Sequence, residues 1–247
     1  MQSPYALPSD LTPVRDRLRA VFGPQLANHR LDPLSQMIRA LIGTRTYDEV
    51  TWAAFIRLHQ AFPDWETLTT AEPDGIEAII DPVVGADQKA RQLPILLRVI
   101  RLKRGDLDLS FLAHEPVDEA MDWLTRLPGI NPKIAASTLA FSTLARPVLV
   151  VDPHVHRVTR RLGLVAAGGT ARQVYDDLMF QVPQGWTEAD LFELHWLLKP
   201  HGQSICSHFD PACALCALKD ICPRVGVSHD QDREVLAFGG RDGASGR

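Results

Sequence analysis

A lysine and an aspartate stand at the starts of two predicted helices within residues 127–157. The sequence Pro-Gly-Ile-Asn at 128–131 is typical of a tight turn, and Pro132 fits the first position of a helix, where its missing N–H costs nothing. Lys133 follows in the first turn, where the positive end of the helix dipole disfavours its charge. Asp152 precedes a proline, which is a second helix-start signal. An amine and a carboxylate at two helix starts could face each other across a groove and act on one substrate.

Each of these two residues also has a plain structural interpretation. A lysine in the first turn of a helix is often only solvated, and position alone favours that role for Lys133. Asp152 would serve as an N-cap before Pro153, a role that aspartate fills well. The cap and a catalytic role are compatible for Asp152, because a capping carboxylate keeps its charge.

All four cysteines fall in one short segment with the spacing C-x6-C-x2-C-x5-C: Cys206, Cys213, Cys216 and Cys222. Disulfides are disfavoured in a chain without an export signal. Four thiolates suit a structural zinc ion, although zinc modules usually present two C-x2–4-C pairs and this segment has one. They also suit a [4Fe–4S] cluster, which accommodates uneven spacing. Ligand count leaves iron–sulfur and zinc about equally favoured, and either would staple this segment with metal.

The elements that must position these residues read as helices separated by Pro and Gly. One more helix starts at Pro132, and the others are expected at 12–22, 32–42, 47–62, 65–69, 73–80, 87–104, 117–126, 153–162, 170–181 and 187–199. Pro94 lies inside one of them and predicts a kink there or two shorter helices. The apolar run 148–151 is the one strand-like candidate, and a buried connection suits four residues without a partner strand. The pattern predicts an all-α fold.

The bulk composition is that of a globular protein with room for one large or two smaller domains, since 45% of its 247 residues are hydrophobic. The net charge of −4 counts against a tight DNA binder, although a local basic face is compatible with it. The sequence shows neither a long apolar run nor a secretory signal, so we expect no membrane partner and an intracellular, cytoplasmic location. Nothing in the pattern suggests more than a monomer.

Together these features resemble the endonuclease III family of DNA glycosylases, within the helix–hairpin–helix superfamily. LPGINPKIAA is similar to the family's LPGVGRKTA hairpin, VDPHVHRV is similar to its VDTHIFRV segment, and the cysteine spacing matches its [4Fe–4S] motif. The resemblance covers about residues 31–223. It implies two helical domains with the DNA groove between them: a six-helix domain with the helix–hairpin–helix at 32–146, and an iron–sulfur cluster domain from 1–31 and 147–223. Residues 224–247 are expected to form a disordered tail.

By this resemblance the chain is a bifunctional DNA glycosylase and abasic-site lyase of base-excision repair, which removes oxidised pyrimidines. Lys133 would attack C1′ of the sugar as the damaged base leaves, and the resulting Schiff base permits β-elimination of the 3′ phosphate. A lysine normally titrates near ~10.4, and a helix N-terminus and a desolvated cleft both lower that value. Asp152 would stabilise the oxocarbenium-like sugar and help to move the amine's proton. The cofactor would be a [4Fe–4S] cluster held by the four cysteines.

The implied partner is double-stranded DNA that contains damaged bases or abasic sites. Asn131 stands where the family has a second glycine, and asparagine is well able to adopt a positive φ. Arg45 falls where the family's glutamine fills the gap left by the extruded base. A second, bulky gap-filling residue would fall near Val84 or Gly85. The predicted DNA-contacting residues are Gly129, Asn131, Arg45, His154, Arg157 and Lys89.

The alternative is a non-catalytic or very weakly active, cluster-containing protein that binds damaged DNA. It is motivated by departures from the family pattern: the loop around Val84, the Asn131-Pro132 pair, and a loop at 207–212 without lysine or arginine. With the acidic net charge, these departures predict weaker and more salt-sensitive DNA binding than is usual for the family.

Overall fold

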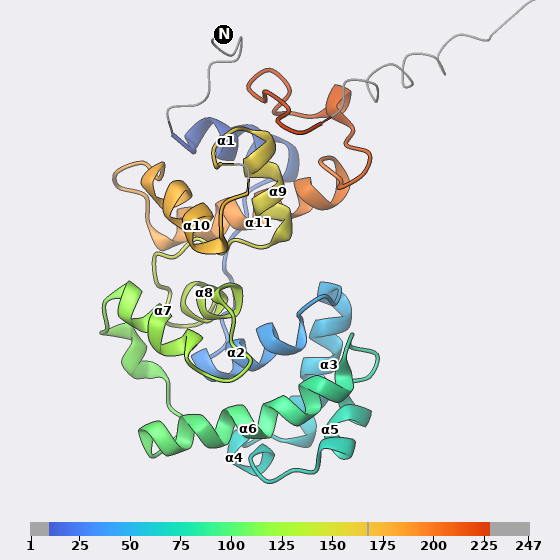
Figure 1. The fold of residues 1–247 in the computed structure, drawn as a ribbon, viewed down its shortest axis with the longest axis vertical. Helices are drawn as coiled ribbons and strands as arrows, with labels where there is room; N and C mark the ends of the chain where they lie inside the picture. The colour runs from blue at the N-terminus through green and yellow to red at the C-terminus, as the bar shows by residue number, and fades with distance from the viewer. Residues whose placement is uncertain (1–9, 167, 228–247) are drawn as a thin grey trace, which may run out of the picture. The chain divides into compact units, whose positions relative to one another are not determined.

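The computed structural model describes residues 10–166 and 168–227, and its regular structure in these ranges is helical (Figure 1). There, eleven α-helices and two 3-10 helices are joined by loops, with one isolated bridge between Leu31 and Ser142 and no strand. The prediction of an all-α fold is confirmed. No helix in the described ranges is long and apolar enough to cross a membrane.

The chain divides into two compact units. The larger contains Ala27–Val150 and Thr187–Phe192, and the other contains the chain up to Leu26, Val151–Trp186, and the chain from Glu193 onward. The larger unit holds α2 (Pro33–Ile42), α3 (Asp48–Ala61), α4 (Trp65–Leu68), α5 (Pro73–Ile80), α6 (Ala86–Arg104), η1 (Ser110–Ala113), α7 (Val117–Thr125) and α8 (Pro132–Phe141). The other holds α1 (Thr12–Phe22), α9 (Pro153–Arg161), α10 (Ala171–Phe180), most of α11 (Glu188–Ser204) and η2 (Cys213–Leu215). The domain boundaries stated above stay a prediction.

Helix α2 forms the core of the larger unit, and nearly all of its residues are buried. Asp32 begins the helix as its N-cap and accepts from the Ser35 backbone N–H at 2.9 Å. The buried polar side chains of α2 are bonded: Gln36 donates to Ser137 Oγ of α8, and Trp65 Nε1 of α4 donates to Ser35 Oγ, both at 2.9 Å. Such pairing removes the penalty of burying polar groups and fixes α8 against α2.

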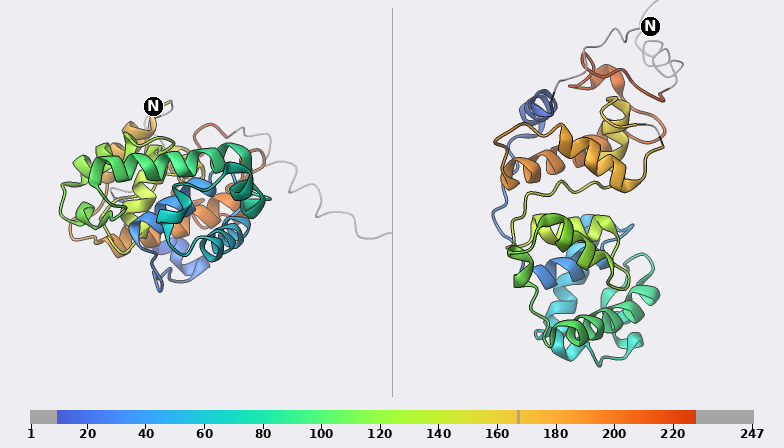
Figure 2. Two further views of the ribbon diagram at one scale, coloured as in Figure 1. Left: turned by 90° about the horizontal axis from the view of Figure 1, so that it is seen from below. Right: turned by 60° about the vertical axis from the view of Figure 1, so that its left-hand side comes forward.

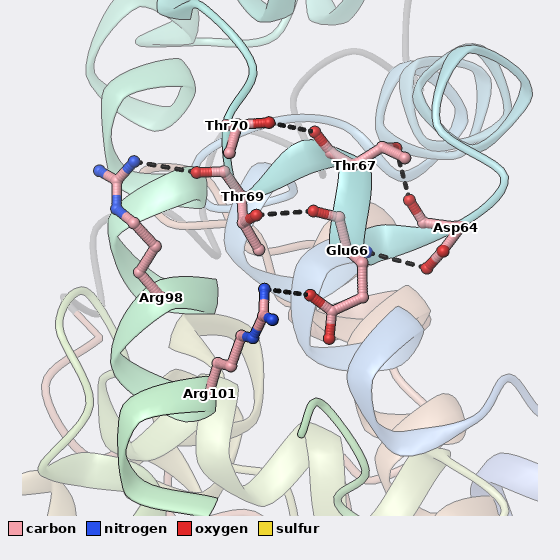
Figure 3. A network of polar contacts seen from close by, with 7 residues as sticks. All are labelled: Asp64, Glu66, Thr67, Thr69, Thr70, Arg98 and Arg101. Carbon is pink, nitrogen blue, oxygen red and sulfur yellow. Dashed lines mark hydrogen bonds and ion pairs between the residues drawn. The ribbon is translucent and has the colours of Figure 1, made fainter. Parts of the chain in front are cut away.

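Helix α6 runs unbroken through Pro94, so the alternative of two shorter helices is wrong. The helix packs against α4 and α5, beside which it lies in both views (Figures 1 and 2). Figure 3 shows the polar contacts at its C-terminal half, where Arg98 donates to the Thr69 carbonyl at 2.9 Å and Arg101 pairs with Glu66 at 3.1 Å. Packing and these contacts stabilise the helix across the position where proline removes one hydrogen bond.

The other unit joins the α1 segment to parts of the chain far later in the sequence. The Leu11 backbone N–H donates to the Gln181 carbonyl at 3.3 Å, and Arg17 Nη1 donates to the Ala217 carbonyl at 3.3 Å. Helix α11 extends to Ser204, beyond its predicted end at residue 199.

Two further predictions concern segments outside the helices. Residues 148–150 are buried without forming a strand, which confirms the expected buried connection. Most of the predicted tail, 228–247, lies outside the described residues, whereas the Val225 backbone N–H donates to the Arg161 carbonyl at 3.0 Å.

Candidate functional site

Gly129 is the sharpest point of the turn between α7 and α8. Its φ is +79°, a left-handed conformation that glycine adopts without strain. Buried Leu127 and Ile130 anchor the turn on either side, and the Ile130 N–H donates to the Leu127 carbonyl at 3.2 Å. A Cβ at position 129 would lie only 2.7 Å from Nε2 of Gln92 on α6. The backbone angle therefore favours glycine, and a side chain here would also displace the end of the Gln92 side chain.

Asn131 caps α8, and the expectation that it would adopt a positive φ is wrong. Its φ is −91° and its ψ is 169°, because the following Pro132 restricts the preceding residue to extended conformations. The Asn131 side-chain oxygen accepts from the Ile134 backbone N–H at 2.9 Å. The departure from the family's glycine thus gives the hairpin a side-chain cap on the helix that carries the lysine.

Lys133 is the second residue of α8 and its side chain is half-buried. The N-terminus of a helix carries a partial positive charge, which makes this an unfavourable place for a second cation. The Lys133 charge lies close enough to Lys89 to contribute to lowering the pKa of that residue. Two lysines of the larger unit therefore share one electropositive region, which suits contact with an anionic substrate.

Asp152 is the N-cap of α9, which confirms its structural interpretation. Its Oδ1 accepts from the Val155 backbone N–H at 2.8 Å, and only 5% of the residue is exposed. A neutral asparagine would cap the helix as well. Burial of a carboxylate carries a desolvation cost that asparagine would avoid, so capping alone does not account for an acidic residue here.

His154 and Arg157 contact each other one turn apart on α9. Arg157 Nη2 lies 3.0 Å from His154 Nδ1 and donates to the Gly202 carbonyl at 2.6 Å, while its Nε donates to the Cys206 carbonyl at 2.9 Å. Burial is the largest cause that lowers the pKa of His154. A neutral His154 that accepts at Nδ1 carries its proton on Nε2. The predicted contact of both residues with DNA stays a prediction, and Arg157 already links α9 to the segment of the first cysteine.

Arg45 and Lys89 come together near the end of α2. Arg45 is exposed and has a φ of +59°, in the loop that follows the helix. Lys89 lies in the first turn of α6, is 8% exposed, and donates from Nζ to the Ile42 and Thr44 carbonyls at 2.8 and 2.7 Å. Their contact with DNA stays a prediction, and the two side chains present themselves differently: one faces solvent and the other faces protein carbonyls.

Cys206, Cys213, Cys216 and Cys222 line one pocket, and all four are free thiols. Apolar side chains surround them, among them Val158, Leu162, Ile205 and Leu218. Two N–H groups point at cysteine sulfurs: Arg161 Nη1 at 3.2 Å from Cys206 Sγ, and the Leu218 backbone N at 3.3 Å from Cys216 Sγ. In the described ranges, no three His, Cys, Asp or Glu residues are close enough to hold one metal ion. The chemistry of the lining, four cysteines among apolar side chains with N–H donors aimed at sulfur, is of the kind that an iron–sulfur cluster needs, while the spacing of the sulfurs is wider than a bound metal requires.

Arg161 and His201 border this pocket and were not singled out from the sequence. Arg161 is 6% exposed and donates to the Ser207 and His208 carbonyls at 2.6 and 2.9 Å. His201 is 2% exposed, its Nε2 lies 3.6 Å from Cys216 Sγ, and burial lowers its pKa to about 4. The one signal in the sequence is spacing, since an arginine four residues after Arg157 lies on the same helix face.

Tyr47 and Gln92 lie beside predicted site residues and were not themselves predicted from the sequence. Tyr47 is 83% exposed and immediately precedes α3, in the same loop as Arg45. Gln92 lies over the Gly129 turn. An aromatic residue within GTRTYDE was available as a signal for Tyr47, whereas the position of Gln92 depends on packing between segments far apart in the chain.

Comparisons with known proteins show the family and the fold of this chain. The model of the family described as "HhH-GPD superfamily base excision DNA repair protein" matches residues 38–184. The chain is 28% identical over 197 residues to "Endonuclease III" of Thermotoga maritima. The aligned region covers 79% of this chain and 85% of the relative. It is 30% identical over 191 residues to "Endonuclease III homolog 1, chloroplastic" of Arabidopsis thaliana. This alignment covers 76% of this chain and 48% of the relative.

A solved structure described as "Structure of a non-covalent Endonuclease III-DNA Complex" is similar with a TM-score of 0.71 and 20% identity. The match covers 90% of this chain and 95% of that chain, and at this identity it shows the fold. The chain spans about half the length of the first curated relatives it matches, 47% and 48% of the two from Arabidopsis thaliana.

Proposed function

Because the chain belongs to the HhH-GPD superfamily of base excision DNA repair proteins, and within it to the endonuclease III family, we propose that it is a bifunctional DNA glycosylase and abasic-site lyase. Its substrates would be oxidised pyrimidines in duplex DNA. The observation that carries the proposal is the start of α8, where a turn with Gly129 at φ +79° leads into a helix whose second residue is Lys133.

Lys133 supplies the amine. Its Nζ attacks C1′ of the deoxyribose while the bond from C1′ to the damaged base breaks and the base leaves with a proton. Movement of the amine's remaining proton to O4′ breaks the C1′–O4′ bond, opens the sugar ring and gives a Schiff base. Protonation of the Schiff-base nitrogen makes C2′ acidic, and removal of a C2′ proton by a base then forms the C2′–C3′ double bond while the C3′–O bond breaks and the 3′ phosphate leaves by β-elimination. A nucleophilic lysine must be deprotonated, and helix-terminus and cationic surroundings favour that form.

Asp152 supplies a negative charge while the C1′–base bond breaks. A carboxylate that is 5% exposed acts in low dielectric, where it stabilises positive charge on the sugar more strongly than it could in water. Its bond to the Val155 N–H holds one oxygen in place, which leaves the carboxylate oriented before substrate arrives.

DNA binding is assigned to the hairpin and to the loop after α2. The Gly129 turn and the start of α8 offer a backbone that a phosphate can approach closely. Exposed Arg45 would occupy the gap left by the extruded nucleotide, where its planar guanidinium can stack and donate hydrogen bonds. Both features lie in the larger unit and belong to segments with defined backbone conformations.

The four cysteines would hold a [4Fe–4S] cluster. A bound cluster would supply a structural cross-link for residues 206–222, in a segment whose only regular element is η2. Arg161 and the Leu218 N–H would donate to the cysteine sulfurs and stabilise their thiolate form. Absorbance near 400 nm, iron and sulfide content, and their loss in Cys213→Ala would test this part of the proposal.

Borohydride trapping tests the lyase proposal directly. Borohydride reduces a Schiff base to a stable secondary amine, so the protein should become covalently attached to a duplex that contains a natural abasic site. Lys133→Ala should remove the adduct entirely, whereas Lys103→Ala, an exposed lysine on α6, should leave it unchanged. A wild-type protein that forms no adduct in a series of salt concentrations would overturn the proposal.

A second candidate function is binding of damaged DNA without chemistry. It is favoured by the loop at 207–212, which carries no lysine or arginine and displays Phe209 at 83% exposure. A panel of lesion-bearing duplexes separates the two functions. The enzyme cleaves at one or more lesions, whereas the binding protein prefers a lesion and leaves the strand intact.

A further inference from the structure

Lys89 is buried in a position where a lysine is unusual. Only 8% of the residue is exposed, and its Nζ donates to the Ile42 and Thr44 carbonyls at 2.8 and 2.7 Å. Helix α2 ends at Ile42, and the last carbonyls of a helix have no partner within the helix. A cation at this end of the helix dipole is favourable. Lys89, which belongs to α6, therefore caps the C-terminus of α2.

The loop that Lys89 holds has a strained backbone. Arg45 adopts a φ of +59°, a left-handed conformation that residues with a side chain rarely adopt. Two further bonds fix the loop: the Thr46 N–H donates to the Gly43 carbonyl at 3.1 Å, and the Val84 N–H donates to Thr46 Oγ1 at 3.2 Å. Such a conformation persists only where its surroundings determine it, and here it displays the Arg45 side chain to solvent.

The helix that carries Lys89 is itself anchored. Arg98 and Arg101, at its other end, bind the Thr69 carbonyl and the Glu66 carboxylate of the α4 segment (Figure 3). The start of α6 is tied to the same loop through Val84. Lys89 thus extends from a fixed helix to the loop, which gives its two hydrogen bonds a rigid origin.

We propose that Lys89 is a positioning residue that holds the loop at 42–46 so that Arg45 can fill the gap beside an extruded nucleotide. The proposal rests on the proposed function and changes the role expected of Lys89 from its sequence. A phosphate contact needs an ammonium group that faces solvent, whereas two N–H donors of Lys89 are bound to backbone carbonyls within the protein.

The two hydrogen bonds of Lys89 can form with or without its charge, although the charge strengthens them. Burial, with contributions from Arg45 and Lys133, lowers the pKa of Lys89 to about 8. A neutral amine keeps two N–H groups, enough to serve both carbonyls. Both hydrogen bonds can therefore persist above that pKa, whereas a phosphate contact would lose its ionic attraction there.

A double-mutant cycle between Lys89 and Arg45 tests the proposal. The probe is a duplex with a tetrahydrofuran abasic-site analogue, compared with the same duplex undamaged, with affinities measured over a range of salt concentrations. Lys89→Met and Arg45→Ala should each weaken binding of the analogue roughly tenfold, the loss of one stacking contact, and the double variant should be no weaker than either. Lys103→Met, on the exposed face of α6, is the matched control and should change neither affinity.

Direct phosphate contact by Lys89 gives the opposite pattern. Lys89→Met would then weaken both duplexes equally, lower the slope of log Kd against log salt by about 0.9, and add to the effect of Arg45→Ala. That result would overturn the proposal. Equal binding of the two duplexes by the wild type would overturn it as well. Failed borohydride trapping with a retained preference for the analogue would overturn only the lyase function.

Two further variants guard against a folding artefact. Lys89→Arg can donate to the same carbonyls and, unlike Lys89→Met, should retain the preference for the analogue duplex. Thr46→Val keeps the shape of the side chain and removes the acceptor for the Val84 N–H. It should weaken analogue binding by a smaller factor, again with no added effect in the Arg45→Ala background. Loss of preference in Lys89→Arg, or no effect of Thr46→Val, would contradict the proposed role.

Discussion

The starts of α8 and α9 are built in nearly the same way and differ in what they can do. Each has an N-cap whose side chain accepts from the backbone N–H of the third helical residue, Asn131 at 2.9 Å and Asp152 at 2.8 Å, and each is followed by proline. The φ and ψ angles of the caps, −91° and 169° against −96° and 175°, agree within a few degrees. Local structure is therefore the same at both sites. Charge and burial separate them, since Asn131 is neutral and exposed whereas Asp152 is acidic and buried.

A third helix start supplies a reference for this comparison. Asp32 caps α2 through the same kind of hydrogen bond, accepts from the Ser35 N–H at 2.9 Å and is exposed to solvent. An aspartate cap thus needs no burial in this chain, and burial of Asp152 is a feature of its site rather than of its capping role.

The largest effect is expected from Asp152→Asn, which keeps the cap and removes the charge. Single-turnover removal of a base from the best lesion of the panel should slow by roughly 10²–10³-fold, because a preorganised charge is lost. The melting temperature should change little, because asparagine caps as well as aspartate. Asp32→Asn makes the same substitution at the exposed cap and should change neither quantity. An unchanged rate in Asp152→Asn would reduce Asp152 to a cap.

Asn131→Asp makes the start of α8 resemble that of α9 and should have an intermediate effect. The new carboxylate lies two residues from Lys133, favours the protonated amine and repels DNA phosphates. We expect the rate of Schiff-base formation near pH 7 to fall several-fold, which corresponds to about 1 kcal/mol in activation free energy. The acidic limb of the pH–rate profile should move to higher pH. Asn131→Ser keeps a cap without the charge and is the control. Equal slowing in both variants would assign the effect to backbone geometry.

The smallest effect is expected on the pH dependence of stability, and it concerns His154, the second residue of α9, which occupies the position that Lys133 has on α8. The pKa of His154 is lowered, chiefly by burial, so the unfolded chain takes up this proton first as the pH falls. The stability contributed by the neutral imidazole is complete above pH 6.5 and declines as the pH falls below that value. His154→Asn keeps an acceptor for Arg157 and does not titrate. Its melting temperature should therefore depend less on pH between 7.5 and 5.5, and parallel curves would contradict this.

Helix starts and stops were predictable where one residue decides them. Asp32 with Pro33, and Gly23 after α1, set boundaries through local geometry, and the structure has α1 and α2 at those places. The extended conformation of Asn131 was also within reach of local rules, because Pro132 restricts the residue before it. The unbroken course of α6 through Pro94 was not, since packing against α4 and α5 compensates the lost hydrogen bond.

The site was predictable in its residue types and much less in its contacts. Four cysteines in one short segment indicated a shared pocket, and the structure has them lining one. The burial of Lys89 was not predictable, because its acceptors are backbone carbonyls 47 and 45 residues away, and any residue supplies a carbonyl. For the same reason Arg157 and Arg161 gave no sign of their carbonyl partners near Cys206.

The division of the chain into two units also sets an order of events during synthesis. The larger unit is almost one continuous segment, Ala27–Val150, and can begin to fold as soon as it leaves the ribosome. Helix α1 is made well before its partner, since Arg17 binds a carbonyl 200 residues later in the chain. At about 5–20 residues per second, α1 waits roughly 10–40 s for that partner. Helix α1 is thus packed into its unit long after it is made, and the segment of the four cysteines completes that unit.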